Sequence, residues 1–212
     1  LMTTIRMLLV LVLLVGVSGT GLVVGIAKAY VDTAPVLDLS QFDQQSQTSF
    51  IYDRNGNLIT DFKGSENRIH ASLDEIPERL QNAFIAIEDT RFREHNGVDV
   101  KRIVGAFVYN FTGSGSTQGG SSITQQLIKQ TILTSEQTYK RKIQEAYLAL
   151  QLETVYTKDQ ILEEYLNVIY LGNSSYGVKV AAQDYFGKDL SELTIRECAM
   201  LAGLNKNPYG YN

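Results

Sequence analysis

The sequence is poor in the residues that cross-link small proteins or bind metals. Among its 212 residues are one cysteine, two histidines and no tryptophan. The single cysteine, Cys198, excludes an intrachain disulfide and a cysteine-based zinc cage, and two histidines exclude a histidine-rich metal site. Positive charge is not in excess either, since the net charge is -4 and the sequence pI is about 5.2. A general nucleic-acid binder gains affinity by neutralising phosphates, so we expect no nucleic acid partner.

Hydrophobic residues are concentrated at the N-terminus, where residues 7–27 form an apolar run without a charge. About 20 apolar residues in a helix cross the hydrocarbon core of a bilayer. A cleaved signal peptide is the alternative, because residues 27–29 read Ala-Lys-Ala, but its apolar region is typically about 7–15 residues long. We therefore expect a single-pass membrane anchor over residues 1–30, an extended polar linker over 31–48 and one domain over 49–212.

The domain is predicted to be mainly α, with one small hairpin at its start. Asn55 and Gly56 stand between the short apolar runs 49–52 and 57–60, which is the strongest local signal for a hairpin. From residue 73 onward apolar residues recur at helical spacing. Two buried stripes are predicted, formed by Ile76, Leu80, Ala83, Phe84 and Ile87 and by Val100, Ile103, Val104, Phe107 and Phe111.

Local signals set the predicted ends of the later helices. Residues 112–120 are rich in glycine and serine, so they predict a mobile loop. Helices should begin after Ser122, Thr157 and Thr194, because each is followed three residues later by glutamine or glutamate, as in a capping box.

The densest polar cluster covers residues 88–99 and directly follows the first predicted stripe. Glu88 would project from the end of a rigid helix, which is the fixed placement that a general base needs. The alternative is a helix-end carboxylate that pairs with Arg91 or Arg93, since carboxylates in such clusters are often ion pairs.

A second cluster, residues 140–145, places two basic side chains beside a carboxylate. On a helix, Arg141 lies four residues and Lys142 three residues before Glu145, so all three share one face. The plain interpretation is a solvated helix face. The functional interpretation is a cationic patch that holds a diphosphate, joined by Lys129 from the preceding helix.

Five segments together resemble the five ordered motifs of the peptidoglycan glycosyltransferases, glycosyltransferase family 51. They are residues 88–99 (EDTRFREHNGVD), 119–126 (GGSSITQQ), 141–153, 158–177 and 196–208. Position 122 is serine where the family usually has threonine, which keeps the hydroxyl group.

The resemblance implies a lysozyme-like helical domain with a small jaw lobe, and it implies lipid II as substrate. A lipid-linked glycan chain would be the donor. Glu88 would remove the proton from the 4-hydroxyl of the acceptor sugar, and attack opposite the departing undecaprenyl diphosphate would invert the anomeric centre. Glu145 would orient the basic side chains or assist near the diphosphate. The substrate and diphosphate would bind to Ser122, Gln126, Lys129, Arg141 and Lys142, and the pocket would be supported by Asp89, Phe92, His95 and Asn167.

The resemblance also sets expectations for cofactors, partners and location. No covalent cofactor is implied, although a divalent cation such as Mg²⁺ or Mn²⁺ could share the diphosphate charge. The enzyme would act at the bacterial cell membrane with its catalytic domain on the extracytoplasmic face, alone or with other cell-wall synthesis proteins. The penicillin-reactive signatures S-x-x-K and K-T-G are absent, so the chain is either a monofunctional enzyme or the front part of a class A penicillin-binding protein with a separate C-terminal transpeptidase domain.

Two other functions stay open at the level of sequence. A lysozyme-like enzyme would cleave glycan strands, using an acid on the leaving sugar oxygen, but it has no need for a diphosphate-binding patch. A membrane-tethered scaffold could keep the fold for partner binding without catalysis.

Overall fold

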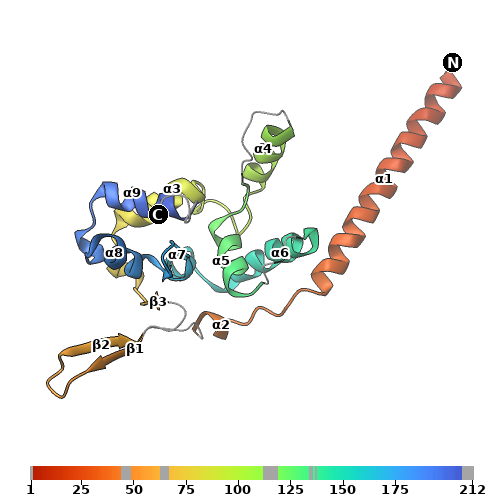
Figure 1. Cartoon of the computed structure of the whole chain (residues 1–212). Helices are drawn as coiled ribbons and strands as arrows, with labels where there is room; N and C mark the ends of the chain where they lie inside the picture. Colours follow the sequence, from red (N-terminus) through yellow and green to blue (C-terminus); the bar gives the residue numbers. More distant parts are fainter. Residues whose placement is uncertain are drawn as a thin grey trace.

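The computed structural model describes residues 2–43, 49–62, 67–111, 119–133, 136 and 138–206. Helices dominate these residues, which confirms the prediction of a mainly α fold (Figure 1). The α-helices are α1 (Met2–Asp32), α2 (Ser40–Asp43), α3 (Glu78–Glu88), α4 (Val100–Phe111), α5 (Ile123–Thr131), α6 (Tyr139–Val155), α7 (Lys158–Val168), α8 (Val178–Phe186) and α9 (Ile195–Leu204). The 3₁₀ helices are η1 (Leu73–Glu75) and η2 (Leu190–Glu192), and the strands are β1 (Ser49–Tyr52), β2 (Leu58–Phe62), β3 (Asn67–Arg68) and β4 (Ser175–Tyr176).

The body of the domain is built from α3 and α5 to α9. Helix α5 packs against both α6 and α7, and α3 packs against α9. Large apolar side chains fill the space between these helices, among them Phe84, Phe92, Leu127, Leu148 and Tyr165, which are all fully buried. Burying a side chain of this size stabilises the fold by about 1.5–3 kcal/mol, so this core holds the helices of the body in fixed positions.

The three predicted capping boxes are confirmed. Ser122, Thr157 and Thr194 are the N-caps of α5, α7 and α9, and each side-chain oxygen accepts a hydrogen bond from the backbone N–H three residues later. In return, the glutamine or glutamate at that position accepts from the N-cap backbone. Reciprocal bonding of this kind satisfies two backbone donors that the first turn of a helix leaves free.

Helix α1 is the predicted anchor. Its segment Thr4–Asp32 is long and apolar enough to cross a membrane, and the apolar window in it is wholly exposed. The end of α1 is fastened to α6, because the side chain of Gln144 donates to the carbonyl of Tyr30 (3.0 Å) and to Oγ1 of Thr33 (3.3 Å). The rest of α1 extends away from the body (Figure 1).

The segment expected to be an extended linker is partly folded. Helix α2 interrupts it, and Phe42 is buried with its ring 5.8 Å from the ring of Tyr156. Leu37 and Leu39 also pack against the core. The polar, glutamine-rich composition pointed to an open chain, but three apolar side chains are enough to fasten this segment to the domain. The rest of the expected linker, residues 44–48, lies outside the described residues.

The predicted hairpin is confirmed. Strands β1 and β2 pair antiparallel, and Gly56 in the turn has a φ of +85°. The carboxylate of Asp53 accepts from the backbone N–H groups of Asn55 and Asn57, both at 2.8 Å, which closes the turn. The other described strands, β3 and β4, form a two-residue parallel pair.

The second predicted stripe is wrong as a core element. In α4, Val100 is 66% exposed and Val104 is 56% exposed, and Ile103 and Val108 are also exposed. The side chains of Phe107 and Phe111, and residues 112–118 of the predicted loop, lie outside the described residues. Figure 1 shows α4 standing apart from the body and extending to the same side as the N-terminal end of α1. The apolar face of α4 is therefore not packed in the protein core.

Two glycines with nearly the same positive φ provide a test of packing beside the site. Gly97 has a φ of +83° and Gly56 a φ of +85°. A Cβ at Gly97 would lie 2.6 Å from the carbonyl oxygen of Ala149, whereas a Cβ at Gly56 would meet nothing within 4 Å. Both alanine variants place a side chain at a similar positive φ, so the difference between them reports mainly the collision with α6.

We expect Gly97→Ala to lower the free energy of unfolding by about 1–3 kcal/mol more than Gly56→Ala, the usual cost of overpacking. Guanidinium unfolding of the two purified variants in detergent measures this difference. Equal losses would show that α6 moves freely away from Gly97.

Candidate active site

One cavity collects most of the residues singled out from the sequence. Its volume is about 640 Å³, and it lies where the end of α3 meets α4, α5, α6 and the end of α9. It is lined by Ile87, Glu88, Arg102, Tyr109, Gly119, Ser121, Gln126, Lys129, Arg141, Lys142, Glu145, Asn205 and Lys206. Polar residues from the two separate sequence clusters therefore line the same cavity. Ile87 was predicted to be buried, but it is exposed and forms part of this lining.

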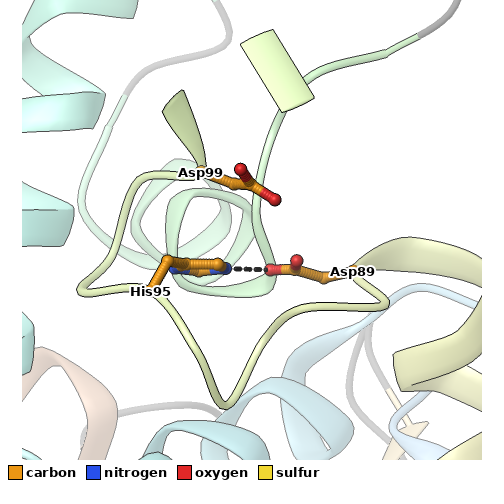
Figure 2. Close-up of side chains that lie close together, drawn as sticks. All are labelled: Asp89, His95 and Asp99. Atoms are coloured by element: carbon orange, nitrogen blue, oxygen red, sulfur yellow. Dashed lines mark hydrogen bonds and ion pairs between the residues drawn. The ribbon is translucent and has the colours of Figure 1, made fainter. Parts of the chain in front are cut away.

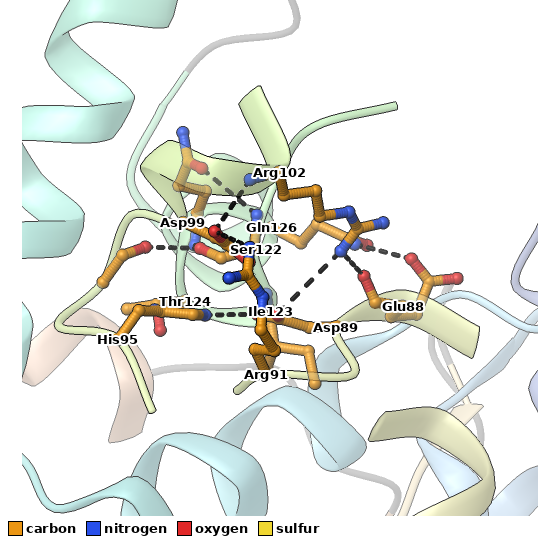
Figure 3. Close-up of polar contacts among 12 residues, drawn as sticks. Glu88, Asp89, Arg91, His95, Asp99, Arg102, Ser122, Ile123, Thr124 and Gln126 are labelled. Carbon is orange, nitrogen blue, oxygen red and sulfur yellow. Dashed lines mark hydrogen bonds and ion pairs between the residues drawn. The ribbon is translucent and has the colours of Figure 1, made fainter. Parts of the chain in front are cut away.

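Two neutral amides hold the carboxylate of Glu88. Nε2 of Gln126 donates to its Oε2 at 2.7 Å, and Nδ2 of Asn205 donates to its Oε1 at 3.0 Å. Gln126 and Glu88 face each other in Figure 3. Because both donors are uncharged, they fix the position of the carboxylate without neutralising it.

The predicted ion-pair alternative for Glu88 is wrong. Arg91 pairs with Asp99 at 2.5 Å, and Arg93 pairs with Asp159 at 2.8 Å. Arg102 approaches Glu88, but its guanidinium donates to the backbone carbonyl and not to the carboxylate (Figure 3). Among the described residues, no cation pairs with the Glu88 side chain.

The hydroxyl of Tyr165 connects the two amides. It donates to Oε1 of Gln126 at 3.3 Å and accepts from Nδ2 of Asn205 at 3.0 Å. Burial, together with the negative charge of Glu88, raises the pKa of Tyr165 well above its usual range. The phenol therefore stays protonated and remains a donor, which turns the Gln126 amide so that its nitrogen faces Glu88.

The second carboxylate, Glu145, is buried and fully engaged. Its Oε2 accepts from Arg141 at 2.7 Å, while its Oε1 accepts from Lys142 and, at 3.2 Å, from Gln125. Glu145 thus positions the two basic side chains.

The cavity carries an excess of positive charge. Five of its side chains are basic, namely Arg102, Lys129, Arg141, Lys142 and Lys206, against the two glutamates, which gives a net charge of +3 among the described residues. Lys129 is exposed. Lys142 also donates to Oγ of Ser121 at 2.6 Å, so it is held at the cavity wall. An arrangement of one uncompensated carboxylate facing several cations suits proton removal beside an anionic leaving group.

Asp89, His95 and Asp99 form a compact cluster behind Glu88. The ligand atoms of these three side chains lie within 4.8 Å of one another, and Nε2 of His95 is 2.9 Å from Oδ2 of Asp89 (Figure 2). The same Asp89 oxygen accepts from the backbone N–H of Ile123 at 3.0 Å, at the start of α5. This cluster therefore joins the end of α3 to the start of α5.

The cluster does not fit a metal ion. Asp99 is occupied by Arg91 and by the backbone N–H of Arg102 (2.9 Å), and Arg102 also lies 3.9 Å from Asp89. Burial works to raise the pKa of Asp99, yet these hydrogen bonds and the charge of Arg91 bring it below its usual range. Two guanidinium groups already compensate the carboxylates, so a divalent cation here would meet like charge.

Ser122 was predicted to bind substrate, and the structure places it elsewhere. It is fully buried, its hydroxyl donates to the carbonyl of Gly97, and it accepts from the backbone of Gln125. The hydroxyl makes the N-cap hydrogen bond of α5 and cannot reach the cavity. Its neighbour Ser121 lines the cavity instead.

Phe92 and Asn167 lie outside the cavity lining. Phe92 is buried, with the ammonium of Lys158 4.5 Å from its ring centre. Asn167 is buried on α7, where its amide donates to the carbonyl of Ala71 and accepts from the Ala71 backbone N–H, both at 2.8 Å. Both residues hold elements in place, Phe92 beside the His95 loop and Asn167 beneath the segment before η1.

Sequence reasoning missed several residues of the site. The most consequential are Arg102, Asn205 and Tyr165, which contact Glu88 or its amide partners. Tyr165 and Asn205 both fall within motif segments, and this position was the signal that the sequence offered for them. Arg102 lies on the largely apolar helix α4. A positive charge in such a segment was the signal that could have identified it as a site residue.

Three curated proteins with similar sequences are much longer than this chain. Penicillin-binding protein 1A from Clostridium perfringens (strain 13 / Type A) is 43% identical over 205 residues, which are 95% of this chain and 30% of that protein. Penicillin-binding protein 1A/1B from Bacillus subtilis (strain 168) is 48% identical over 183 residues, or 86% of this chain and 20% of that protein. Penicillin-binding protein 1A from Streptococcus oralis is 48% identical over 191 residues, which are 89% of this chain and 30% of that protein.

The chain thus spans between 20% and 30% of the length of these relatives. A family model described as Transglycosylase matches residues 55–212, a range that contains all five motif segments and the whole cavity lining. The match covers most of the chain and confirms the family resemblance drawn from the motifs. The chain belongs to the Transglycosylase family.

Proposed function

We propose that the chain polymerises lipid II into the glycan strands of peptidoglycan by inverting glycosyl transfer and releases undecaprenyl diphosphate. The observation that carries this proposal is the single cavity in which Glu88, without a cationic partner among the described residues, faces Arg141, Lys142 and Lys129. Family membership supports the same reaction class.

Glu88 is the proposed general base. It accepts the proton of the acceptor 4-hydroxyl while that oxygen attacks the anomeric carbon of the lipid-linked donor, and the bond from this carbon to the diphosphate oxygen breaks. The amides of Gln126 and Asn205 support this role by holding the carboxylate still. A single displacement from the opposite face inverts the anomeric centre.

The basic side chains are proposed to stabilise the leaving group. Negative charge grows on the diphosphate as the bond breaks, so cations fixed in advance lower the barrier. Arg141 offers a planar guanidinium that binds phosphate through two hydrogen bonds, whereas Lys142 and Lys129 act as point charges. Glu145 is assigned a positioning role, because its oxygens already accept from Arg141, Lys142 and Gln125.

The proposal includes a divalent cation, Mg²⁺ or Mn²⁺, that shares the diphosphate charge. Hard cations of this kind prefer phosphate and carboxylate oxygens. In the cavity each Glu88 oxygen accepts one protein hydrogen bond, which leaves acceptor capacity for a cation that arrives with the substrate.

Chelation provides the test of the cation. We expect EDTA to lower the rate of polymerisation several-fold and added Mg²⁺ or Mn²⁺ to restore it, without a change in the melting temperature. A rate that is the same with EDTA and with added cation would remove the divalent ion from the proposal.

The anchor and domain boundaries complete the proposal. Residues 1–30 would hold the chain in the bacterial cell membrane as a single pass, with the domain 49–212 on the extracytoplasmic face, where tethering raises the encounter rate with lipid-linked substrates. The exposed apolar face of α4, which extends to the same side as α1, supports a second contact with lipid (Figure 1). A C-terminal transpeptidase domain in a longer protein, and other cell-wall synthesis proteins, are proposed partners.

The decisive experiment offers two labelled substrates to the same protein. With labelled lipid II in detergent we expect longer glycan products, and with preformed labelled glycan we expect no shortening. Shortened glycan would favour a lysozyme-like enzyme. No change in either substrate, from protein that melts cooperatively, would favour a scaffold.

A further inference from the structure

A second cavity adjoins the candidate active site on the side of the membrane-spanning helix. Its volume is about 990 Å³, and its walls are Tyr30 near the end of α1, Lys129 on α5 and residues 138–142 at the start of α6. We name it the outer groove. It shares Lys129, Arg141 and Lys142 with the active-site cavity, whereas Tyr139 and Lys140 line the outer groove alone.

The outer groove is strongly basic. Four of its lining side chains are cationic, and among the described residues none of its lining is acidic. Glu145 lies beneath and compensates part of the charge of Arg141 and Lys142, but Lys140 is exposed and has no ion-pair partner among the described residues. Cavity walls that have a low dielectric constant and carry charge of one sign raise the local concentration of ions of the opposite sign. The groove therefore suits an anion such as a phosphate group.

The anchor proposed for α1 sets the position of the groove relative to the bilayer. Tyr30 follows Ala27, the last residue of the uncharged run, by less than one helical turn. The side chain of Gln144 on α6 donates to the carbonyl of Tyr30, which holds the start of the domain at the end of the span. The groove therefore lies at the level where a membrane meets water.

Tyr139 gives an independent indication of a lipid surface. It is 90% exposed at the first position of α6, beside Lys140. Tyrosines gather at membrane interfaces, because the ring enters the headgroup layer while the hydroxyl stays in water. An exposed aromatic ring next to a basic groove matches the surface that faces phospholipid headgroups.

We propose that the outer groove binds the phosphate headgroup of an anionic phospholipid, with Lys140 contacting the phosphate and Tyr139 entering the headgroup layer. The inference rests on α1 as a membrane anchor and goes beyond glycosyl transfer. A bound headgroup fastens the start of α6, and with it Arg141 and Lys142, at a constant height above the bilayer. The lipid-linked diphosphate of the substrate offers the same phosphate chemistry. The experiment must therefore distinguish a phospholipid headgroup from this diphosphate.

The experiment uses the whole chain in a zwitterionic detergent and titrates three probes. They are dihexanoyl-phosphatidylglycerol and dihexanoyl-phosphatidylcholine below their micelle-forming concentrations, and inorganic diphosphate. We expect phosphatidylglycerol to bind more tightly than phosphatidylcholine, and Lys140→Ala to weaken phosphatidylglycerol about fivefold, the factor expected for one basic residue at an anionic membrane surface. Diphosphate affinity should not change in Lys140→Ala.

Arg54→Ala is the matched control, because Arg54 is an exposed base on the hairpin, which projects at the other end of the body from α1 (Figure 1). It should leave phosphatidylglycerol binding unchanged. Equal binding of the two phospholipids, or equal losses in Lys140→Ala and Arg54→Ala, overturns the headgroup site. A loss of diphosphate affinity in Lys140→Ala as large as the loss for phosphatidylglycerol assigns the groove to the substrate instead. None of these readouts requires polymerisation, so the headgroup site and the proposed enzyme activity stand or fall separately.

Discussion

Glu88→Gln is expected to reduce glycan polymerisation by about 10²–10⁴-fold, the usual contribution of a general base. A glutamine side chain has nearly the same shape as glutamate, but its amide does not accept the acceptor proton. Polymer length and rate from labelled lipid II measure the effect.

The surroundings of Glu88 predict that the fold survives this change. The variant can keep one of the two hydrogen bonds from Gln126 and Asn205, and its buried neighbours on α3 are untouched. We expect a melting temperature close to that of the parent protein. The matched control is Glu94→Gln, which removes one exposed carboxylate from the same polar segment and should leave polymerisation unchanged. Parent-like polymerisation by Glu88→Gln would falsify the assignment of the base.

Local rules predicted the parts of the fold that depend on neighbours in sequence. The hairpin turn at Gly56 and the capping boxes of α5, α7 and α9 require a few adjacent residues, and all are confirmed. The capping rule had already predicted that the Ser122 hydroxyl bonds to the backbone of α5. The separate assignment of the same hydroxyl to substrate binding conflicted with that prediction. One hydroxyl does not serve both purposes when the cap is buried.

Sequence periodicity could not show which surroundings an apolar face meets. Leu80 and Phe84 of the α3 stripe pack inside the body, whereas the similar stripe of α4 stays exposed on a helix that extends to the same side as α1. Both have helical spacing, because a helix facing lipid and a helix facing a protein core need the same pattern. The burial of Val100 and Val104 was therefore predicted wrongly, although the helix itself was predicted correctly.

The contacts around Glu88 were beyond sequence reasoning for a different reason. Its amide partners lie 38 and 117 residues away along the chain, and Arg102 reaches its backbone from α4. Such pairs form only when α3, α5 and α9 are packed together. The motif order indicated that these segments belong to one site, but not which side chains would face which.

Lys142→Ala is expected to lower the turnover number about 10²–10³-fold, the typical cost of removing one group that stabilises charge in a transition state. Lys142 lines the active-site cavity and is held there by Glu145 and by Ser121. Its ammonium group is thus positioned before the reaction, and its loss leaves more of the diphosphate charge uncompensated when the bond breaks.

Folding should be affected much less than turnover. Glu145 keeps its hydrogen bonds from Arg141 and Gln125 in the variant, and the Lys142 side chain is 44% exposed. Lys142→Arg, which keeps the charge in a different shape, should recover part of the lost activity, while Arg54→Ala removes an equal charge far from the cavity and should cost nothing. If the melting temperature of Lys142→Ala fell in proportion to its activity, the cluster would be an ordinary helix face. A transition-state role requires instead that turnover falls while the fold, and most of the affinity for lipid II, remain.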